Sequence, residues 1–169
     1  MSVLVYTESW DGKFRKSTFE AVSYANETAK VLGTDLVAVS LGEVSNDELN
    51  KLGNYGAAKV ISASDINKGD GQAATAVIAE QANDANAIVF SNTYTAKMIA
   101  PRLSAKLKIG AISNVIEVAT STTPLTVKRK AFSSKAIEIA TINSEKAIIS
   151  IAPNSFGLIE TGGSLTIET

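Results

Sequence analysis

The chain has 169 residues and a formal net charge of −1, and it contains neither histidine nor cysteine. Without these residues it has no disulfide, no thiolate metal site and no imidazole general base. The balanced charge does not indicate nucleic-acid binding, and no apolar run reaches the ~20 residues that span a bilayer. We therefore expect one domain, located in the cytoplasm, or in the mitochondrial matrix if a presequence was removed.

The chain begins with a predicted strand and a polar loop. Val3–Thr7 is a β-branched run typical of a buried strand, and the loop after it contains the turn signal Asp11-Gly12. The same loop carries Trp10, which has two interpretations. It could fold back over the edge of the core, or it could anchor a partner, since tryptophan is enriched at binding hot spots.

Helix and strand signals then alternate. Two capping boxes, Ser17 with Glu20 and Ser45 with Glu48, predict helix starts, and Gly33 predicts the end of the first helix. The apolar spacing predicts a further helix at Ala73–Ala82. It also predicts strands at Asp35–Leu41, Val60–Ala63 and Ala87–Phe90. This alternation indicates a parallel sheet covered by helices on both faces.

The segment after Phe90 adds a strand–helix–strand unit. A polar loop, Ser91–Tyr94, leads to a helix with a basic face formed by Lys97, Arg102 and Lys106, and Ala111–Val118 is the next strand. The loop at the carboxyl end of such a strand is where α/β domains usually bind ligands. The basic face is either a solvated helix face or a patch that meets an acidic partner.

The pattern changes after the fourth helix. Leu125–Lys130, Ala136–Thr141 and Lys146–Ile151 are strand-like and too close together for helices, and Asn143-Ser144 fits a tight turn between the last two. We expect an antiparallel extension at one sheet edge. The predicted fold is thus a three-layer α/β/α domain with a mostly parallel, Rossmann-like sheet.

Arg129 differs from its basic neighbours. In a strand, Lys128 and Lys130 point to one face and Arg129 points to the other. If the lysines face water, Arg129 faces inward or into an interface, and arginine is costly to bury without a partner. A structural ion pair and an interface role both remain open.

No catalytic or metal-binding pattern stands out. Gly69-x-Gly71-x-x-Ala74 matches the loose dinucleotide pattern, but Ser64–Lys68 separate it from the preceding strand, which favours an ordinary helix start. No serine or threonine has a base beside it in the sequence, and no two carboxylates are spaced as an acid–base pair.

Several segments together resemble the N-terminal domain of the electron transfer flavoprotein α subunit. Their order and spacing span nearly the whole chain. The segments are Val3–Ala25, the L-G-x-Y-G-A stretch Leu52–Ala57, the A-P-R helix Ala100–Leu107, Ile112–Val115, Arg129–Ala136 and the closing Ile149–Phe156. Lys130, Ser134 and Ala152 depart from the family, which has proline, glycine and arginine there.

The resemblance implies a scaffold domain at residues 1–156, followed by a linker or strap at residues 157–169 toward an absent C-terminal FAD domain. In the family this domain contacts a β subunit that holds AMP. The heterodimer accepts electrons from flavin dehydrogenases, in processes such as fatty acid oxidation, and passes them to a membrane quinone reductase. By this resemblance the chain is an electron-carrier component and not an enzyme, with no cofactor of its own. Trp10, Arg129 and Lys135 are the candidate subunit-interface residues.

A second reading stays open. A stand-alone adenine-nucleotide-binding α/β module would use the loops after Thr7, Ala63 and Phe90. Ligand binding distinguishes the two, because a scaffold domain without a phosphate loop should bind neither FAD nor AMP.

Overall fold

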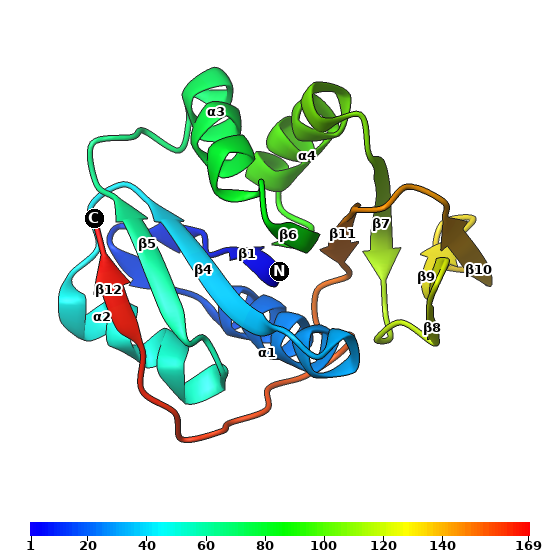
Figure 1. The fold of residues 1–169 in the computed structure, drawn as a ribbon, viewed down its shortest axis with the longest axis horizontal. Coiled ribbons are helices and arrows are strands. Elements are labelled where there is room, and N and C mark those ends of the chain that lie inside the picture. The colour runs from blue at the N-terminus through cyan, green and yellow to red at the C-terminus, as the bar shows by residue number, and fades with distance from the viewer.

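The computed structural model describes residues 1–169 as a three-layer α/β domain, as predicted. Helices α1 (Lys16–Leu32), α2 (Asn46–Asn50) and the 3₁₀ helix η1 (Lys51–Tyr55) cover one face of the sheet. Helices α3 (Gly71–Gln81) and α4 (Tyr94–Leu107) cover the other face (Figure 1). None of these helices combines the length and the apolar character needed to cross a membrane.

The main sheet has the strand order β10-β9-β7-β11-β6-β1-β4-β5-β12, with β8 beside β9. Strands β2 and β3 form a separate hairpin around Asp11 and Gly12. The strands are β1 (Ser2–Tyr6), β2 (Ser9–Trp10), β3 (Lys13–Phe14), β4 (Asp35–Leu41), β5 (Lys59–Ala63), β6 (Ala85–Ser91), β7 (Gly110–Val115), β8 (Ser121–Thr122), β9 (Leu125–Ala131), β10 (Ala136–Ile142), β11 (Ala147–Ile151) and β12 (Thr166–Glu168).

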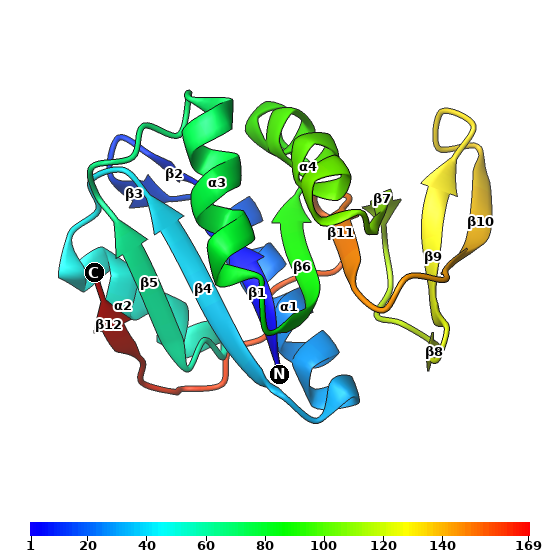
Figure 2. The same cartoon turned by 45° about the horizontal axis from the view of Figure 1, so that its top comes forward.

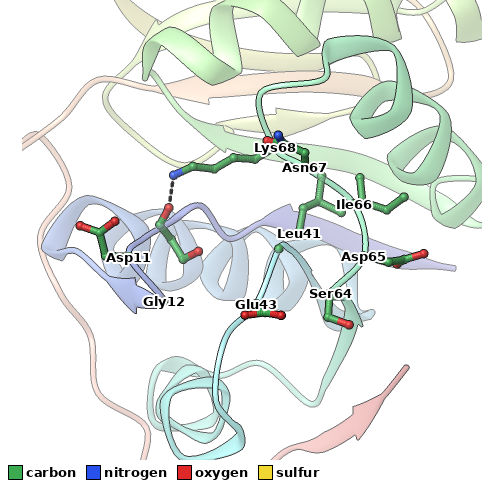
Figure 3. A pocket seen from close by; sticks show the side chains of 11 residues that line it. Asp11, Gly12, Leu41, Glu43, Ser64, Asp65, Ile66, Asn67 and Lys68 are labelled. Carbon is green, nitrogen blue, oxygen red and sulfur yellow. Dashed lines mark hydrogen bonds between the residues drawn. The ribbon is translucent and has the colours of Figure 1, made fainter.

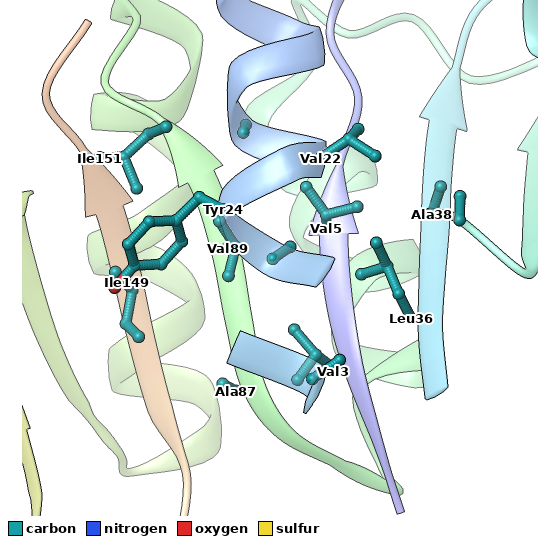
Figure 4. Packing of buried hydrophobic residues seen from close by; sticks show 14 of the residues in the cluster. Val3, Val5, Val22, Tyr24, Leu36, Ala38, Ala87, Val89, Ile149 and Ile151 are labelled. Atoms are coloured by element: carbon teal, nitrogen blue, oxygen red, sulfur yellow. The ribbon is translucent and has the colours of Figure 1, made fainter. Parts of the chain in front are cut away.

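The core lies on both faces of the parallel strands. Because successive side chains of a strand point to opposite faces, Val3 and Val5 of β1 pack toward α1, whereas Leu4 and Tyr6 pack toward α3 and α4. Figure 4 shows the α1 side, where Tyr24 lies among the strand residues. Two buried faces explain the continuous apolar runs in the sequence.

The position of β11 corrects the predicted topology. Ala147–Ile151 does not form a hairpin with β10. It lies between β6 and β7 and is parallel to both. All five of its residues are buried and four of them are apolar, as expected in the interior of a parallel sheet. The expected Asn143-Ser144 hairpin turn is therefore wrong.

The β9–β10 hairpin confirms the antiparallel extension. It places Arg129 opposite Glu138, with 3.3 Å between Arg129 Nη1 and Glu138 Oε2. Lys128 lies in register with Ile139, and its ammonium pairs with Glu117 at 2.9 Å. The connecting turn carries Ser134 with φ 64, the position where the resembling family has glycine.

The first helix begins differently from the prediction. Helix α1 starts at Lys16 with Arg15 as N-cap residue and no side-chain cap, so the Ser17–Glu20 capping box is absent. Glu20 is instead 1% exposed. Its carboxylate accepts hydrogen bonds from the backbone N–H groups of Asn154 (2.8 Å), Phe156 (2.8 Å) and Gly157 (3.0 Å).

The C-terminal tail follows the α1 side of the domain. The Ile159 N–H donates to Ser23 Oγ at 3.0 Å, and the Phe156 ring lies edge-on to Tyr24, with the ring centroids 5.2 Å apart. The tail then passes η1, where the Thr161 N–H donates to the Asn54 carbonyl at 2.7 Å, and ends as β12 beside β5 (Figure 1). Residues 157–169 show little periodicity, so the sequence did not predict this strand.

Glu48 is a buried carboxylate at the start of α2. Ser45 caps this helix as predicted, but the Glu48 side chain turns away from it and accepts from the Phe14 N–H at 3.0 Å. Lys51 lies at 2.7 Å and Lys13 at 3.5 Å from its second oxygen. Burial raises the pKa of Glu48, but the bonds from Lys51 and Phe14 and the charge of Lys13 outweigh it and hold the pKa below its ordinary value.

This lowered pKa predicts a loss of stability in acid. Its contribution is present above the unfolded pKa of about 4.3 and is lost as the pH falls through the lower folded pKa, because the unfolded state binds more protons. We expect Glu48→Gln to be less stable than the wild type at neutral pH and to lose less stability on acidification. Thermal melts followed by circular dichroism across this pH range check it, and equal slopes for both proteins would contradict it.

Candidate functional site

The strand order places the usual ligand position of an α/β sheet between β1 and β6. From β1 the chain crosses through α1 to β4 on one side, whereas β6 lies on the other side and leads into α4. The two loops at the carboxyl ends of these strands therefore diverge and leave a crevice. Figure 2 shows the β6 strand ending beneath α4, beside β1.

A cavity of about 500 Å³ occupies this crevice. It is lined by the loops after β1 and β6 and by the first turns of α1 and α4. Its lining residues are Glu8, Trp10, Arg15, Ser17, Ser91, Asn92, Thr93, Tyr94, Thr95, Lys97 and Pro153. The loop after Phe90, which the sequence singled out, thus forms one wall of the site.

Glu8 is the central group of the crevice. It is 5% exposed, and its two carboxylate oxygens accept hydrogen bonds of 2.6 Å from the hydroxyls of Thr93 and Thr95. The Lys68 ammonium lies 3.9 Å from one of these oxygens. Burial, and to a smaller extent the charge of Glu8, raises the pKa of the neighbouring Tyr6 phenol. Arg15 and Lys97 also line the crevice, so its lining combines one acidic and two basic side chains.

Trp10 lies on the β2–β3 hairpin and contacts two cations. The Arg15 guanidinium is 4.2 Å and the Lys68 ammonium 4.8 Å from the centroid of its ring system. Cation–π contacts of this kind hold an aromatic ring in a defined orientation. Trp10 is half-buried and belongs to neither hydrophobic cluster. Its role as a partner anchor stays a prediction.

A second cavity of about 390 Å³ lies at the ends of β4 and β5 (Figure 3). Three acidic residues, Asp11, Glu43 and Asp65, are among its lining residues. The Lys68 ammonium, drawn in the same view, donates to the backbone carbonyl of Ser9. The acidic lining disfavours phosphate groups.

The start of α4 is a capped helix terminus and not a glycine-rich phosphate loop. A phosphate binds helix N-termini through free backbone N–H groups and is repelled by nearby carboxylates. At α4, Thr93 Oγ1 accepts from the Ala96 N–H at 3.1 Å, and the buried Glu8 carboxylate lies beside this turn. This turn therefore has no donor set specific to a phosphate, and the cations of the crevice are the side chains of Arg15 and Lys97.

The Gly69-x-Gly71-x-x-Ala74 segment also has an ordinary structural role. Asp70 caps α3 by accepting from the N–H groups of Gln72 and Ala73, so these donors are occupied. A Cβ atom on Gly71 would lie 3.0 Å from Met98 Sδ, so the glycine allows α3 and α4 to pack closely. The geometry supports the helix-start interpretation.

The candidate interface residues do not form one cluster. Arg129 and Lys135 belong to the β9–β10 hairpin at one end of the sheet, whereas Trp10 lies near the end of β1, with β6, β11 and β7 in between. The basic residues of α4 that the sequence highlighted, Lys97, Arg102 and Lys106, form no ion pair. Lys97 reaches the crevice, whereas Arg102 and Lys106 line a separate hollow beside α3.

The sequence reasoning missed Glu8 and the anchoring role of Glu20. Glu8 follows directly after a buried strand, which is a signal for a site residue in a parallel sheet. Glu20 gave no comparable signal, because its partners are separated from it by more than 130 residues.

Residues 3–169 match the family model described as the electron transfer flavoprotein domain. The electron transfer flavoprotein subunit alpha of Bacillus subtilis is 31% identical over 175 residues, covering 99% of this chain and 53% of that protein. The protein of the same name from Syntrophomonas wolfei is 28% identical over 165 residues, covering 95% of this chain and 50% of that protein. The chain thus spans about half the length of these curated relatives. By its fold and by this match, the chain belongs to the electron transfer flavoprotein domain family.

Proposed function

We propose that residues 1–156 form the scaffold and subunit-contact domain of an electron transfer flavoprotein α subunit. The observation that carries this proposal is the family match over residues 3–169. Residues 157–169 would lead toward a C-terminal domain that holds FAD. This proposal agrees with the observation that the chain aligns with only about half of the length of each relative.

In this proposal the chain works in a heterodimer with an electron transfer flavoprotein β subunit that holds AMP. The heterodimer accepts electrons from flavin dehydrogenases and passes them to a membrane quinone reductase, in the cytoplasm or the mitochondrial matrix. FAD supplies the electron transfer when it is bound, and the protein supplies binding and orientation. The role of this chain is to shape and hold the surfaces against which the flavin domain and the β subunit pack.

The first test is binding to an electron transfer flavoprotein β subunit from the same organism. Trp10 is the single tryptophan of the chain, so its fluorescence reports on one position. If Trp10 anchors the partner, its emission should shift to shorter wavelength on addition of the β subunit, because the partner removes water from the ring. The difference spectrum between the wild type and Trp10→Phe isolates this signal. An unchanged spectrum at saturating β subunit would assign Trp10 a purely intramolecular role.

The alternative, a stand-alone adenine-nucleotide-binding module, is favoured by one observation, the cavity between β1 and β6. Calorimetric titration of the chain with AMP and with FAD separates the two functions. The scaffold proposal predicts no micromolar binding, because the chain has no recognisable phosphate-binding loop. Saturable micromolar binding of AMP that also quenches Trp10 would establish the nucleotide-binding function.

A further inference from the structure

The N-terminus of α1 opens into the crevice between β1 and β6. Its N-cap residue Arg15 and its second helical residue Ser17 both line this cavity. The first N–H groups of an α-helix have no acceptor within the helix. At α1 no side chain caps them, and no acidic residue occupies the first turn. At α4, on the other wall, Thr93 caps the helix. The α1 terminus is therefore the end at which an anion is stabilised.

A second group in the crevice lacks a partner. Ser91, the last residue of β6, lines the cavity and is 7% exposed, and its Oγ forms no hydrogen bond. Buried hydroxyl groups in proteins are normally hydrogen-bonded, because an unpaired one has lost its contact with water. Among the residues that line the crevice, Ser91 alone has such an atom. This independent observation indicates a ligand that accepts a hydrogen bond from Ser91 Oγ.

The charges of the lining select the kind of anion. Two cations, Arg15 and Lys97, line the crevice, and neither forms an ion pair within the chain. Glu8 is the acidic residue of the lining, so positive charges exceed negative charges by one. A carboxylate ligand balances this excess, whereas a phosphate monoester carries about −1.5 to −2 charges at pH 7 and exceeds it. The lining therefore favours a monoanion.

We propose that the crevice binds a small organic monocarboxylate. Its carboxylate accepts hydrogen bonds from the first N–H groups of α1 and from Ser91 Oγ, and it lies near Arg15 and Lys97. An aromatic or apolar body of the ligand packs beside Trp10 and Tyr94, which line the same cavity of about 500 Å³. This inference goes beyond the proposed function, because it needs neither the β subunit nor FAD.

The test titrates the isotope-labelled chain with sodium benzoate at constant ionic strength and follows the backbone amides by NMR. We expect saturable shifts of the Lys16 and Ser17 amides with a Kd of about 1 mM or below, because a ligand of this size makes few contacts. The fluorescence of Trp10 should change with the same Kd. Sodium acetate should shift the same amides with a higher Kd, because it lacks the aromatic body.

Two variants remove the proposed contacts. Arg15→Gln/Lys97→Gln takes both cations from the crevice and should raise the Kd for benzoate by about tenfold. Ser91→Ala removes the unpartnered hydroxyl and should raise this Kd by about threefold. Lys106→Gln is the matched control, because Lys106 belongs to α4 but does not line the crevice, and it should leave the Kd unchanged. Thermal melts show which variants keep the wild-type fold.

Inorganic phosphate and AMP distinguish a carboxylate site from a phosphate site. Both should bind the wild type more weakly than benzoate does. Glu8→Gln removes the negative charge of the lining. It should lower the Kd for phosphate by a larger factor than the Kd for benzoate, because Glu8 repels a dianion more strongly than a monoanion.

Three results would overturn the inference. The absence of saturable shifts at Lys16 and Ser17 excludes a carboxylate at the α1 terminus. Benzoate binding that is unchanged in Arg15→Gln/Lys97→Gln and in Ser91→Ala places the benzoate elsewhere on the chain. Phosphate binding that is tighter than benzoate binding assigns the crevice to phosphate ligands. None of these results bears on binding of the β subunit, which tests the proposed function separately.

Discussion

Glu20→Gln should lower the free energy of unfolding by about 2–4 kcal/mol, which is among the largest effects expected for a single isosteric change in this chain. The Glu20 carboxylate is buried and accepts three backbone hydrogen bonds from residues 154–157. Glutamine has nearly the same shape, but it loses the charge and turns an N–H₂ group toward one of these donors. The tail would then lose its main attachment to α1.

The measurement combines denaturant unfolding with hydrogen exchange. Glu27→Gln on the same helix is the matched control, because Glu27 pairs only with Lys30 at the surface and should contribute little. In Glu20→Gln the amides of Asn154, Phe156 and Gly157 should exchange faster than in the control. Equal stability of the two variants, with unchanged exchange in the tail, would show that Glu20 does not anchor it.

Gly56→Ala should destabilise the domain by about 2–4 kcal/mol for two combined reasons. Gly56 ends η1 with φ 105, a backbone conformation that a residue with a Cβ atom rarely adopts. In addition, an added Cβ atom would lie within 2.6 Å of Asn26 Nδ2, on a side chain that is itself buried. Chemical denaturation of the variant measures the combined cost.

Two further variants separate these reasons. Gly157→Ala has a similar positive φ of 92 with no atom within 4 Å of the added Cβ, so it reports the backbone strain alone and should cost about 1 kcal/mol. Asn26→Ala in the Gly56→Ala background removes the clash. If the double variant is no more stable than the sum of the single changes predicts, the steric explanation is wrong.

The L-G-x-Y-G-A stretch, Leu52–Ala57, has a structural role around η1. A Cβ atom on Gly53 would lie 3.0 Å from the Gly163 carbonyl oxygen and 3.1 Å from Leu165 N, so the absent side chain lets the tail pass close to η1. Tyr55 stacks on Phe19 of α1, with the ring centroids 4.7 Å apart. These residues hold η1, α1 and the tail together, and none of them lines the crevice between β1 and β6.

The amino-acid sequence by itself determined the elements whose signals are local. Apolar runs of strand length, helical spacing and glycine stops placed β1, β4, β5, β6 and the helices to within a few residues. The strand-like runs after residue 124 predicted an antiparallel extension, but the expected turn joined β10 to β11, whereas the structure pairs β10 with β9. The alternation of Lys128, Arg129 and Lys130 also placed Arg129 on the opposite face from its neighbours, where it pairs with Glu138. These features depend on residues that are close in the chain.

Only the tertiary structure decided the partners of groups that are far apart in the chain. Strand β11 is inserted between β6 and β7 because a strand buried on both faces is most stable in the interior of a parallel sheet, although a hairpin with β10 is closer in sequence. Glu20 does not form the predicted capping box, because its carboxylate accepts hydrogen bonds from three backbone N–H groups of the C-terminal tail. Glu8 meets Thr93 and Thr95 because β1 and β6 are neighbours in the sheet. Such long-range pairing follows from packing of the whole chain, which no local pattern encodes.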